Sequence, residues 1–149
     1  FSLQRNDDGH LSLVYRRDNT IYIRESNDVL GTSWQAEKTL KGPITNIREF
    51  NHIIRSNTNL LVLSYHTFAD SASPPHLGPG NWKSSVFSKD SGGNWNEAPQ
   101  TDLTIITNAK LGRGNIFELD DGSYSHSHFD NSSVVIPKVL KINSILAKV

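Results

Sequence analysis

Residues 88–95 read SKDSGGNW. The spacing of Ser88, Asp90, Gly92 and Trp95 in it is the feature of the sequence that says most about the fold. A run of this kind makes a tight turn in which the Asp90 carboxylate and the Ser88 hydroxyl accept backbone N–H groups and Gly92 takes a positive φ. The indole of Trp95 is then expected to lie back across the hairpin and cover it.

A looser copy of the pattern lies upstream in residues 26–34, SNDVLGTSW. Its matching positions are Ser26, Asp28, Gly31 and Trp34, with one extra residue between the Asp and the Gly. Each copy follows a strand-like stretch, TIYIRE at residues 20–25 and WKSSVF at residues 82–87. Two copies after the same kind of element indicate a structural repeat.

Three segments read strand, tight turn, strand, and they align on Gly9, Asn59 and Gly122. The turn residues tolerate unusual dihedrals, and the flanks are rich in β-branched and aromatic residues. In the first two units the hairpin is followed by a third strand, the Asp-containing turn and a fourth strand. Four antiparallel strands in a row are typical of a propeller blade.

The repeat divides one partial domain into units of about residues 1–45, 46–105 and 106–149. The proline-rich insert at residues 68–80 predicts an irregular loop. Residues 131–149 lack a further copy of the turn, and they fit a strand interrupted at Pro137, a tail on a neighbour, or the start of another element. The expected fold is all-β, with about two and a half to three four-stranded antiparallel blades.

The turn at residues 88–95 resembles the Asp box of sialidases and other Asp-box β-propellers, where it joins the two outer strands of a blade. Residues 112–124, GRGNIFELDDGSY, are similar to a blade opening of that superfamily, and Arg113 matches the Arg that precedes its inner strand. Residues 14–28 resemble the strand pair that leads into a family Asp box. The resemblance covers most of residues 1–130 and implies a sialidase-like β-propeller.

The resemblance also implies an anionic sugar as ligand, because sialidases grip the carboxylate of sialic acid with three arginines. Arg113 is the position that matches by local motif. Arg48, with Glu49 beside it, is a second candidate before the inner strand of the second unit. Each arginine has a plainer alternative: an ion pair with Glu118 or Asp120 for Arg113, and a structural role for Arg48.

Sialidases also use a Tyr nucleophile assisted by a Glu, and an Asp acid, but the sequence assigns no residue to these roles. Tyr15, Tyr65 and His128 take equivalent hairpin positions, which indicates shared packing. His126 and His128 share one strand face, yet two imidazoles do not predict a metal site, and no cofactor is expected. Trp82 is expected to cap the core or, alternatively, to offer a sugar-stacking platform.

Composition limits the classes of partner that we expect for this chain. Fifteen basic and fifteen acidic residues leave no net charge to attract nucleic acid, and no apolar segment predicts a membrane span. The chain has no cysteine, which excludes disulfides and thiolate metal sites. Together with the resemblance, these features lead us to expect an extracellular or secreted protein with a carbohydrate partner.

The number of units sets the last expectation. A propeller closes with at least four blades, whereas this sequence supplies two complete units and the beginning of a third. We therefore expect a fragment of an exo-sialidase-type glycosidase, or a protomer that completes its ring with further copies. The alternative is a non-catalytic Asp-box module for glycan binding or assembly, for example in a viral or phage attachment protein.

Overall fold

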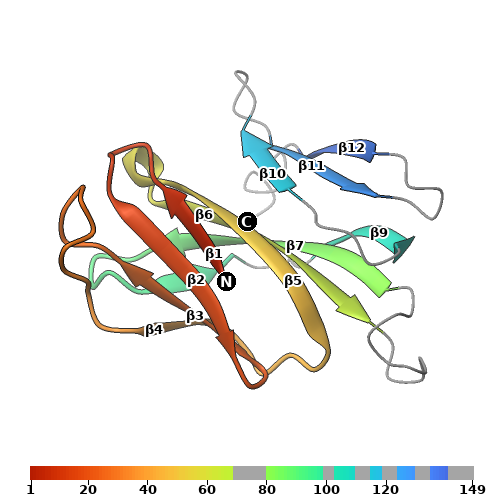
Figure 1. The fold of residues 1–149 in the computed structure, drawn as a ribbon, viewed down its shortest axis with the longest axis horizontal. Coiled ribbons are helices and arrows are strands. Elements are labelled where there is room, and N and C mark those ends of the chain that lie inside the picture. Colours follow the sequence, from red (N-terminus) through yellow and green to blue (C-terminus); the bar gives the residue numbers. More distant parts are fainter. Residues whose placement is uncertain (69–79, 99–102, 110–114, 119–123, 130–134, 141–149) are drawn as a thin grey trace.

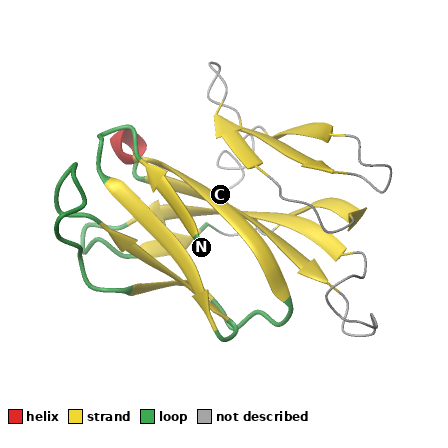
Figure 2. Ribbon diagram, viewed as in Figure 1, coloured by secondary structure: helices red, strands yellow, loops and turns green. Residues whose placement is uncertain are grey.

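The computed structural model describes residues 1–68, 80–98, 103–109, 115–118, 124–129 and 135–140, the last four ranges as backbone strands only. This part of the chain forms strands and one short 3-10 helix (Figures 1 and 2). The first elements are β1 (Ser2–Arg5), β2 (Leu11–Arg17), β3 (Thr20–Glu25) and β4 (Lys38–Lys41). They are followed by β5 (Ile47–Arg55), η1 (Ser56–Thr58), β6 (Leu60–Phe68), β7 (Gly80–Lys89) and β8 (Trp95–Glu97). The last are β9 (Leu103–Ala109), β10 (Asn115–Glu118), β11 (Tyr124–Phe129) and β12 (Val135–Leu140).

The first sheet is an antiparallel meander in the order β1-β2-β3-β4. Its first turn closes where Gly9, at φ 87°, donates its N–H to the Asn6 carbonyl at 3.0 Å. Buried and less buried residues alternate along β2 and β3, and Val14, Ile21 and Ile23 are buried on one face. Four antiparallel strands in this order were predicted for the first unit, and this prediction is confirmed.

The second sheet has the order β5-β6-β7-β8, and β9 also pairs with β7. The long strand β7 reaches both partners, because Phe87–Lys89 pairs with β8 and Gly80–Ser84 pairs with β9. Asn59 takes the left-handed conformation, φ 52°, at the predicted turn into β6. The strand order predicted for the second unit is therefore also confirmed.

A third sheet consists of β10, β11 and β12. The last strand runs through Pro137, whose backbone lies opposite Ser127 of β11. Of the three interpretations of residues 131–149, a strand is correct for Val135–Leu140, but the expected interruption at Pro137 is wrong, because pairing with β11 continues through that residue. The remainder of the segment lies outside the described residues. The turn at Gly122 and the insert at residues 69–79 also lie outside them.

The first two sheets are stacked (Figure 1). They share one hydrophobic core. Apolar side chains from both sheets form it: Val14, Ile21, Ile23, Leu40, Ile47, Phe50, Ile54, Leu61, Leu63, Tyr65, Phe87 and Trp95. The all-β prediction is confirmed, and no sheet closes on itself among the described strands.

The first strands of successive sheets lie side by side. β1 contacts β5, and β5 contacts β10. β1 and β5 run in the same direction, because the side chain of Ser2 meets that of His52 and, further along, Asp7 accepts the N–H of Ser56 at 2.6 Å. The starts of β1 and β5 therefore lie at the same side of the stack.

A buried polar network joins these strands around His52. The Ser12 hydroxyl donates to Asn6 Oδ1 at 2.7 Å, so it accepts from Nε2–H of His52 at 2.7 Å. Nδ1 of His52 then accepts from the Ser2 hydroxyl at 3.0 Å. Burial lowers the pKa of His52 to about 3, and the Ser12 contact opposes this shift, so the imidazole is neutral at physiological pH.

The neutral state of His52 predicts a loss of stability in mild acid. The unfolded chain binds a proton on this residue as pH falls below about 6.5, whereas the native protein does not until about pH 3. Between pH 7 and pH 5 the free energy of unfolding should fall by about 2 kcal/mol on account of His52 alone. Urea unfolding at both pH values should show that His52→Gln loses this increment, and the half-buried control His10→Gln should keep it. An equal pH dependence in wild type and His52→Gln would contradict the assignment.

Candidate functional site

We call the turn at residues 26–34 the first box and the turn at residues 88–95 the second box. Both carboxylate oxygens of Asp28 accept hydrogen bonds within the first box. Oδ1 of Asp28 accepts the N–H groups of Leu30 and Thr32 at 2.9 and 3.0 Å. Oδ2 accepts the Thr32 hydroxyl at 2.7 Å and the N–H of Ser33 at 3.0 Å. These hydrogen bonds lower the pKa of Asp28 far below its usual range, and those from Thr32 contribute most. The carboxylate therefore acts as the ionised centre of the turn.

The other positions of this box support the same turn. The Ser26 hydroxyl accepts the N–H of Leu11 at 2.8 Å and donates to the Asp28 carbonyl at 2.7 Å. Gly31 has φ 69°, and a side chain there would meet Leu11 at 2.7 Å. The half-buried Trp34 donates its indole N–H to the Gly31 carbonyl at 3.0 Å, so it lies back over its own turn as a box Trp was predicted to do.

The second box uses Asp90 in the same way. Its Oδ1 accepts the N–H of Asn94 at 2.8 Å, and its Oδ2 accepts the side-chain amide of Asn96 at 3.0 Å. The hydrogen bonds lower the pKa of Asp90, and the one from the Asn94 N–H contributes most. Ser88 is exposed at the end of β7, with its backbone opposite Asn96.

One detail predicted for the second box is wrong, and the surroundings of Trp95 were predicted only in part. The positive φ belongs to Gly93, at 77°, and not to Gly92, because the N–H of Gly93 closes the turn on the Asp90 carbonyl at 2.9 Å. Trp95 lies beside Lys89 of its own hairpin and also reaches the first sheet, which was not predicted. It is buried in the core between the two sheets, where a carboxylate of the first sheet takes its indole N–H.

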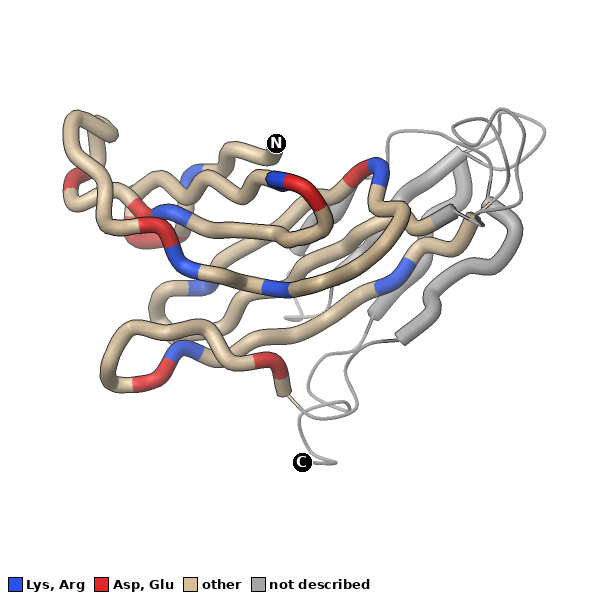
Figure 3. The backbone as a smooth tube through the Cα atoms, turned by 90° about the horizontal axis from the view of Figure 1, so that it is seen from below, with Lys and Arg blue, Asp and Glu red and all other residues tan. Residues whose placement is uncertain are grey.

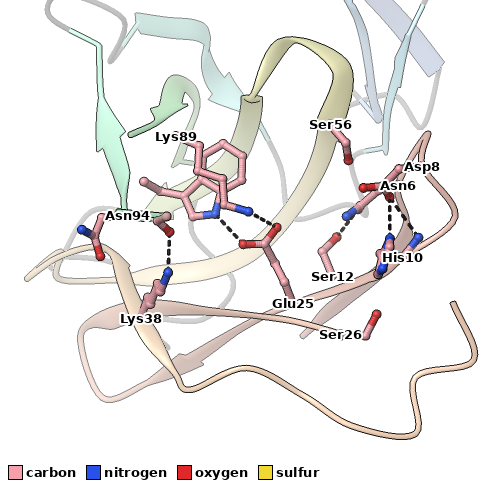
Figure 4. A network of polar contacts seen from close by, with 12 residues as sticks. Asn6, Asp8, His10, Ser12, Glu25, Ser26, Lys38, Ser56, Lys89 and Asn94 are labelled. Atoms are coloured by element: carbon pink, nitrogen blue, oxygen red, sulfur yellow. Dashed lines mark hydrogen bonds and ion pairs between the residues drawn. The ribbon is translucent and has the colours of Figure 1, made fainter. Parts of the chain in front are cut away.

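That carboxylate belongs to Glu25, the last residue of β3. Its Oε2 accepts the indole N–H of Trp95 at 3.2 Å, and its Oε1 pairs with the ammonium of Lys89 at 2.8 Å (Figure 4). The Lys89 ammonium also lies over the Trp95 ring, 5.2 Å from its centre. The side chain of Glu25 is only 10% exposed, so this pair is largely desolvated.

The sequence analysis did not predict the contacts of Glu25 with Lys89 and Trp95, which we call the Glu25 contacts, although a signal was available. Glu25 immediately precedes the first box, and Lys89 lies inside the second. Nearby, Lys38 of β4 donates to the carbonyl of Gly93. The end of β3 and the start of β4 therefore both hold the second box.

Arg48, one of the two candidate ligand residues, lies with Glu49 in a β-bulge near the start of β5. The pairing with β6 shifts register between Ile47 and Phe50, and such bulges re-aim side chains. Arg16 of the first sheet donates to the Ile47 carbonyl and so fixes this end of the strand. Burial lowers the pKa of the half-buried Arg48 and Glu49 opposes the shift, but a guanidinium stays charged in either case.

Arg113, the other candidate, lies outside the described residues. β10 begins two positions later at Asn115, and β10 contacts β5. Of its alternative ion-pair partners, Glu118 ends β10 with its side chain undescribed, and Asp120 lies outside the described part. The structure thus brings the strand that follows Arg113 beside the strand that begins with the Arg48 bulge.

Tyr15 and Tyr65, which take equivalent hairpin positions in the sequence, differ in environment. Tyr65 is buried in the core, with the ammonium of Lys41 5.6 Å from its ring centre. Tyr15 stacks on Tyr22, with 5.9 Å between ring centres, and donates its hydroxyl to Glu37. Partial burial is the larger cause, and this hydrogen bond the second, of a raised pKa of Tyr15.

Trp82 does not form a sugar-stacking platform. It is fully buried, and its ring meets that of His66 edge-on with 5.3 Å between centres, so the prediction of a core cap is the correct one. His126 and His128 both lie on β11, but their side chains are not among those described.

Charges of both signs are interspersed along the described backbone (Figure 3). Within the same residues, no cluster of three or more His, Cys, Asp or Glu side chains is placed to hold a metal ion. None of the helical segments that the structure describes has the length and apolar character needed to cross a bilayer. Comparisons with models of known families, with curated proteins and with solved structures each found no match.

Because the two box tryptophans lie in different surroundings, we expect their removal to lower the free energy of unfolding by different amounts. Trp95→Ala should lower the free energy of unfolding by about 3–5 kcal/mol, because it empties part of the shared core and leaves Glu25 without its indole donor. Trp34→Ala is the matched control and should cost roughly half as much, because its ring is only half-buried. Chemical unfolding of both variants checks this, and equal losses would mean that Trp95 has no special role between the sheets.

Proposed function

We propose that this chain is part of a sialidase-like Asp-box β-propeller that binds sialic acid or a related anionic sugar, with hydrolysis when the chain forms part of a longer enzyme. One observation carries the proposal. Two Asp-centred turns occur at the same point, between the third and fourth strands, of two stacked four-stranded antiparallel meanders. This repeated combination of turn and strand order is what an Asp-box blade requires.

The side-by-side first strands suggest where a ligand would bind. In a propeller such strands surround the central channel, so side chains at their starts converge on one opening. Arg48 lies in the bulge at the start of β5, and Arg113 immediately precedes β10, the neighbouring first strand. Two guanidinium groups from adjacent strands would offer paired donors to a sugar carboxylate.

A second candidate function is a non-catalytic glycan-binding module. The two tyrosines discussed above favour it: Tyr65 is enclosed in the core, and Tyr15 has a raised pKa, so neither is activated as a nucleophile. Under this alternative the same arginines bind the sugar, and a catalytic Tyr, Glu and Asp are not needed.

Glycan binding by the purified chain tests the proposal. We expect it to bind sialyllactose more tightly than lactose by calorimetry, because only the former carries a carboxylate. Arg113→Ala should weaken sialyllactose binding about 10- to 100-fold, the effect of losing a charge-assisted hydrogen bond. Arg48→Ala should weaken it less, because Arg113, the position that matches by local motif, would remain.

The exposed Arg5→Ala is the matched control and should bind as wild type does. Equal binding of the two sugars, or an Arg113→Ala variant with unchanged affinity, would contradict the proposal. Release of a fluorogenic aglycone from a sialoside by the chain would exclude the non-catalytic alternative, whereas binding without release would favour it.

A further inference from the structure

The bulge near the start of β5 determines where the side chain of Arg48 points. Two residues of β5, Arg48 and Glu49, lie there opposite the single residue His66 of β6. The pairing register shifts at this place, between Ile47 and Phe50. A bulge interrupts the ladder of hydrogen bonds and re-aims the side chains of its residues. The direction of the Arg48 side chain therefore depends on how the backbone is held at the bulge.

Arg16 of the first sheet holds the backbone at the start of this bulge. It lies on the same face of β2 as Val14, and its cross-strand partner Ile21 is fully buried. From this position its Nη1 donates to the carbonyl of Ile47, the residue before Arg48, and its Nε donates to the carbonyl of Asp18 in its own turn. Two donors of one planar guanidinium thus join the turn of the first sheet to the bulge of the second.

The turn between β2 and β3 also holds the segment that leads into β5. The carbonyl of Asn19 accepts the N–H of Ile44 at 2.7 Å. Gly42 lies so close to Thr20 that a side-chain carbon at Gly42 would come within 3.0 Å of the Thr20 Cα. Figure 1 shows this turn beside the connection from β4 to β5. The start of β5 is therefore built on the first sheet, and Arg16 supplies the contact next to the bulge.

Arg17, the next residue of β2, has different contacts. Its guanidinium pairs with Glu37 at 2.8 Å and lies 4.4 Å from the centre of the Tyr22 ring. Successive residues of a strand point to opposite faces, so Arg16 faces the second sheet and Arg17 does not. Two adjacent residues of equal charge therefore separate a specific role at the bulge from a general effect of positive charge at this end of β2.

We propose that Arg16 is a positioning residue, which holds the Ile47 carbonyl and thereby sets the direction in which Arg48 presents its guanidinium to a ligand. The inference rests on the proposed function, in which Arg48 helps to bind the carboxylate of an anionic sugar. Arg16 acts through Arg48, because its own Nε and Nη1 are engaged by backbone carbonyls. An arginine that is held in its binding position loses less conformational freedom when the ligand binds, and this preorganisation raises affinity.

Calorimetry with sialyllactose tests this role with variants of adjacent residues. Arg16→Ala should raise the dissociation constant about tenfold, which is within the range of coupling between residues of one network. Arg16→Lys keeps the charge but loses the planar fork, so it should recover part of this loss. Arg17→Ala is the matched control and should change the dissociation constant by less than about twofold. Equal losses at Arg16 and Arg17 would overturn the proposal, because they would indicate a general effect of charge.

A double-mutant cycle with Arg48 separates positioning from an effect on stability. If Arg16 acts through Arg48, adding Arg16→Ala to Arg48→Ala should weaken sialyllactose binding no further. Losses that add in full would overturn the proposal, since Arg16 would then affect the sugar by another route. Melting temperatures report whether the variants fold, and Arg16→Lys takes the place of Arg16→Ala in the cycle if the alanine variant does not.

Hydrogen exchange without sugar distinguishes this inference from the proposed function. The amides of Arg48, Glu49 and Phe50 should exchange at least about tenfold faster in Arg16→Ala than in the wild type, and Arg17→Ala should leave their rates unchanged. Rates that Arg16→Ala does not alter would overturn the positioning role, whether or not sugar binds. Faster exchange in a chain that binds no sialyllactose would support the hold of Arg16 on the bulge and refute only the proposed function.

Discussion

The desolvated carboxylate of Glu25 is the constraint on which the stacking of the two sheets depends. A largely buried negative charge must be paired, and here the two partners, Lys89 and Trp95, both come from the second Asp box. Sliding one sheet against the other by a single residue would separate these groups and leave the charge without compensation. The Glu25 contacts therefore fix how the two sheets are aligned, which apolar packing alone specifies less strictly.

The His52 network belongs to the same layer of the interface. Ser12, which accepts the imidazole N–H, is the cross-strand partner of Glu25 and faces the same way. A polar layer thus extends from the first strands to the box, while Val14, Ile23 and Leu40 form the apolar remainder. Since every member of the His52 chain has a defined donor or acceptor, the layer adds orientation without an orphaned polar group.

Local sequence was sufficient for the strand order and for the role of the box aspartates. β3 covers the predicted residues 20–25, and Asp28 and Asp90 bind the N–H groups of their own turns. The direction of Trp95 could not be read locally, because its partner Glu25 lies 70 residues away. The bulge at Arg48 likewise depends on how β5 aligns with β6, a tertiary property that residue types do not encode.

A repeat protein offers a comparison that a single domain lacks, because equivalent positions should have equivalent surroundings. Tyr65 has a sheet packed over it, whereas Tyr15, at the same position of the first unit, contacts Tyr22 and Glu37 of its own sheet. The two tyrosines are alike in sequence context, so the difference lies in the neighbour and not in the residue.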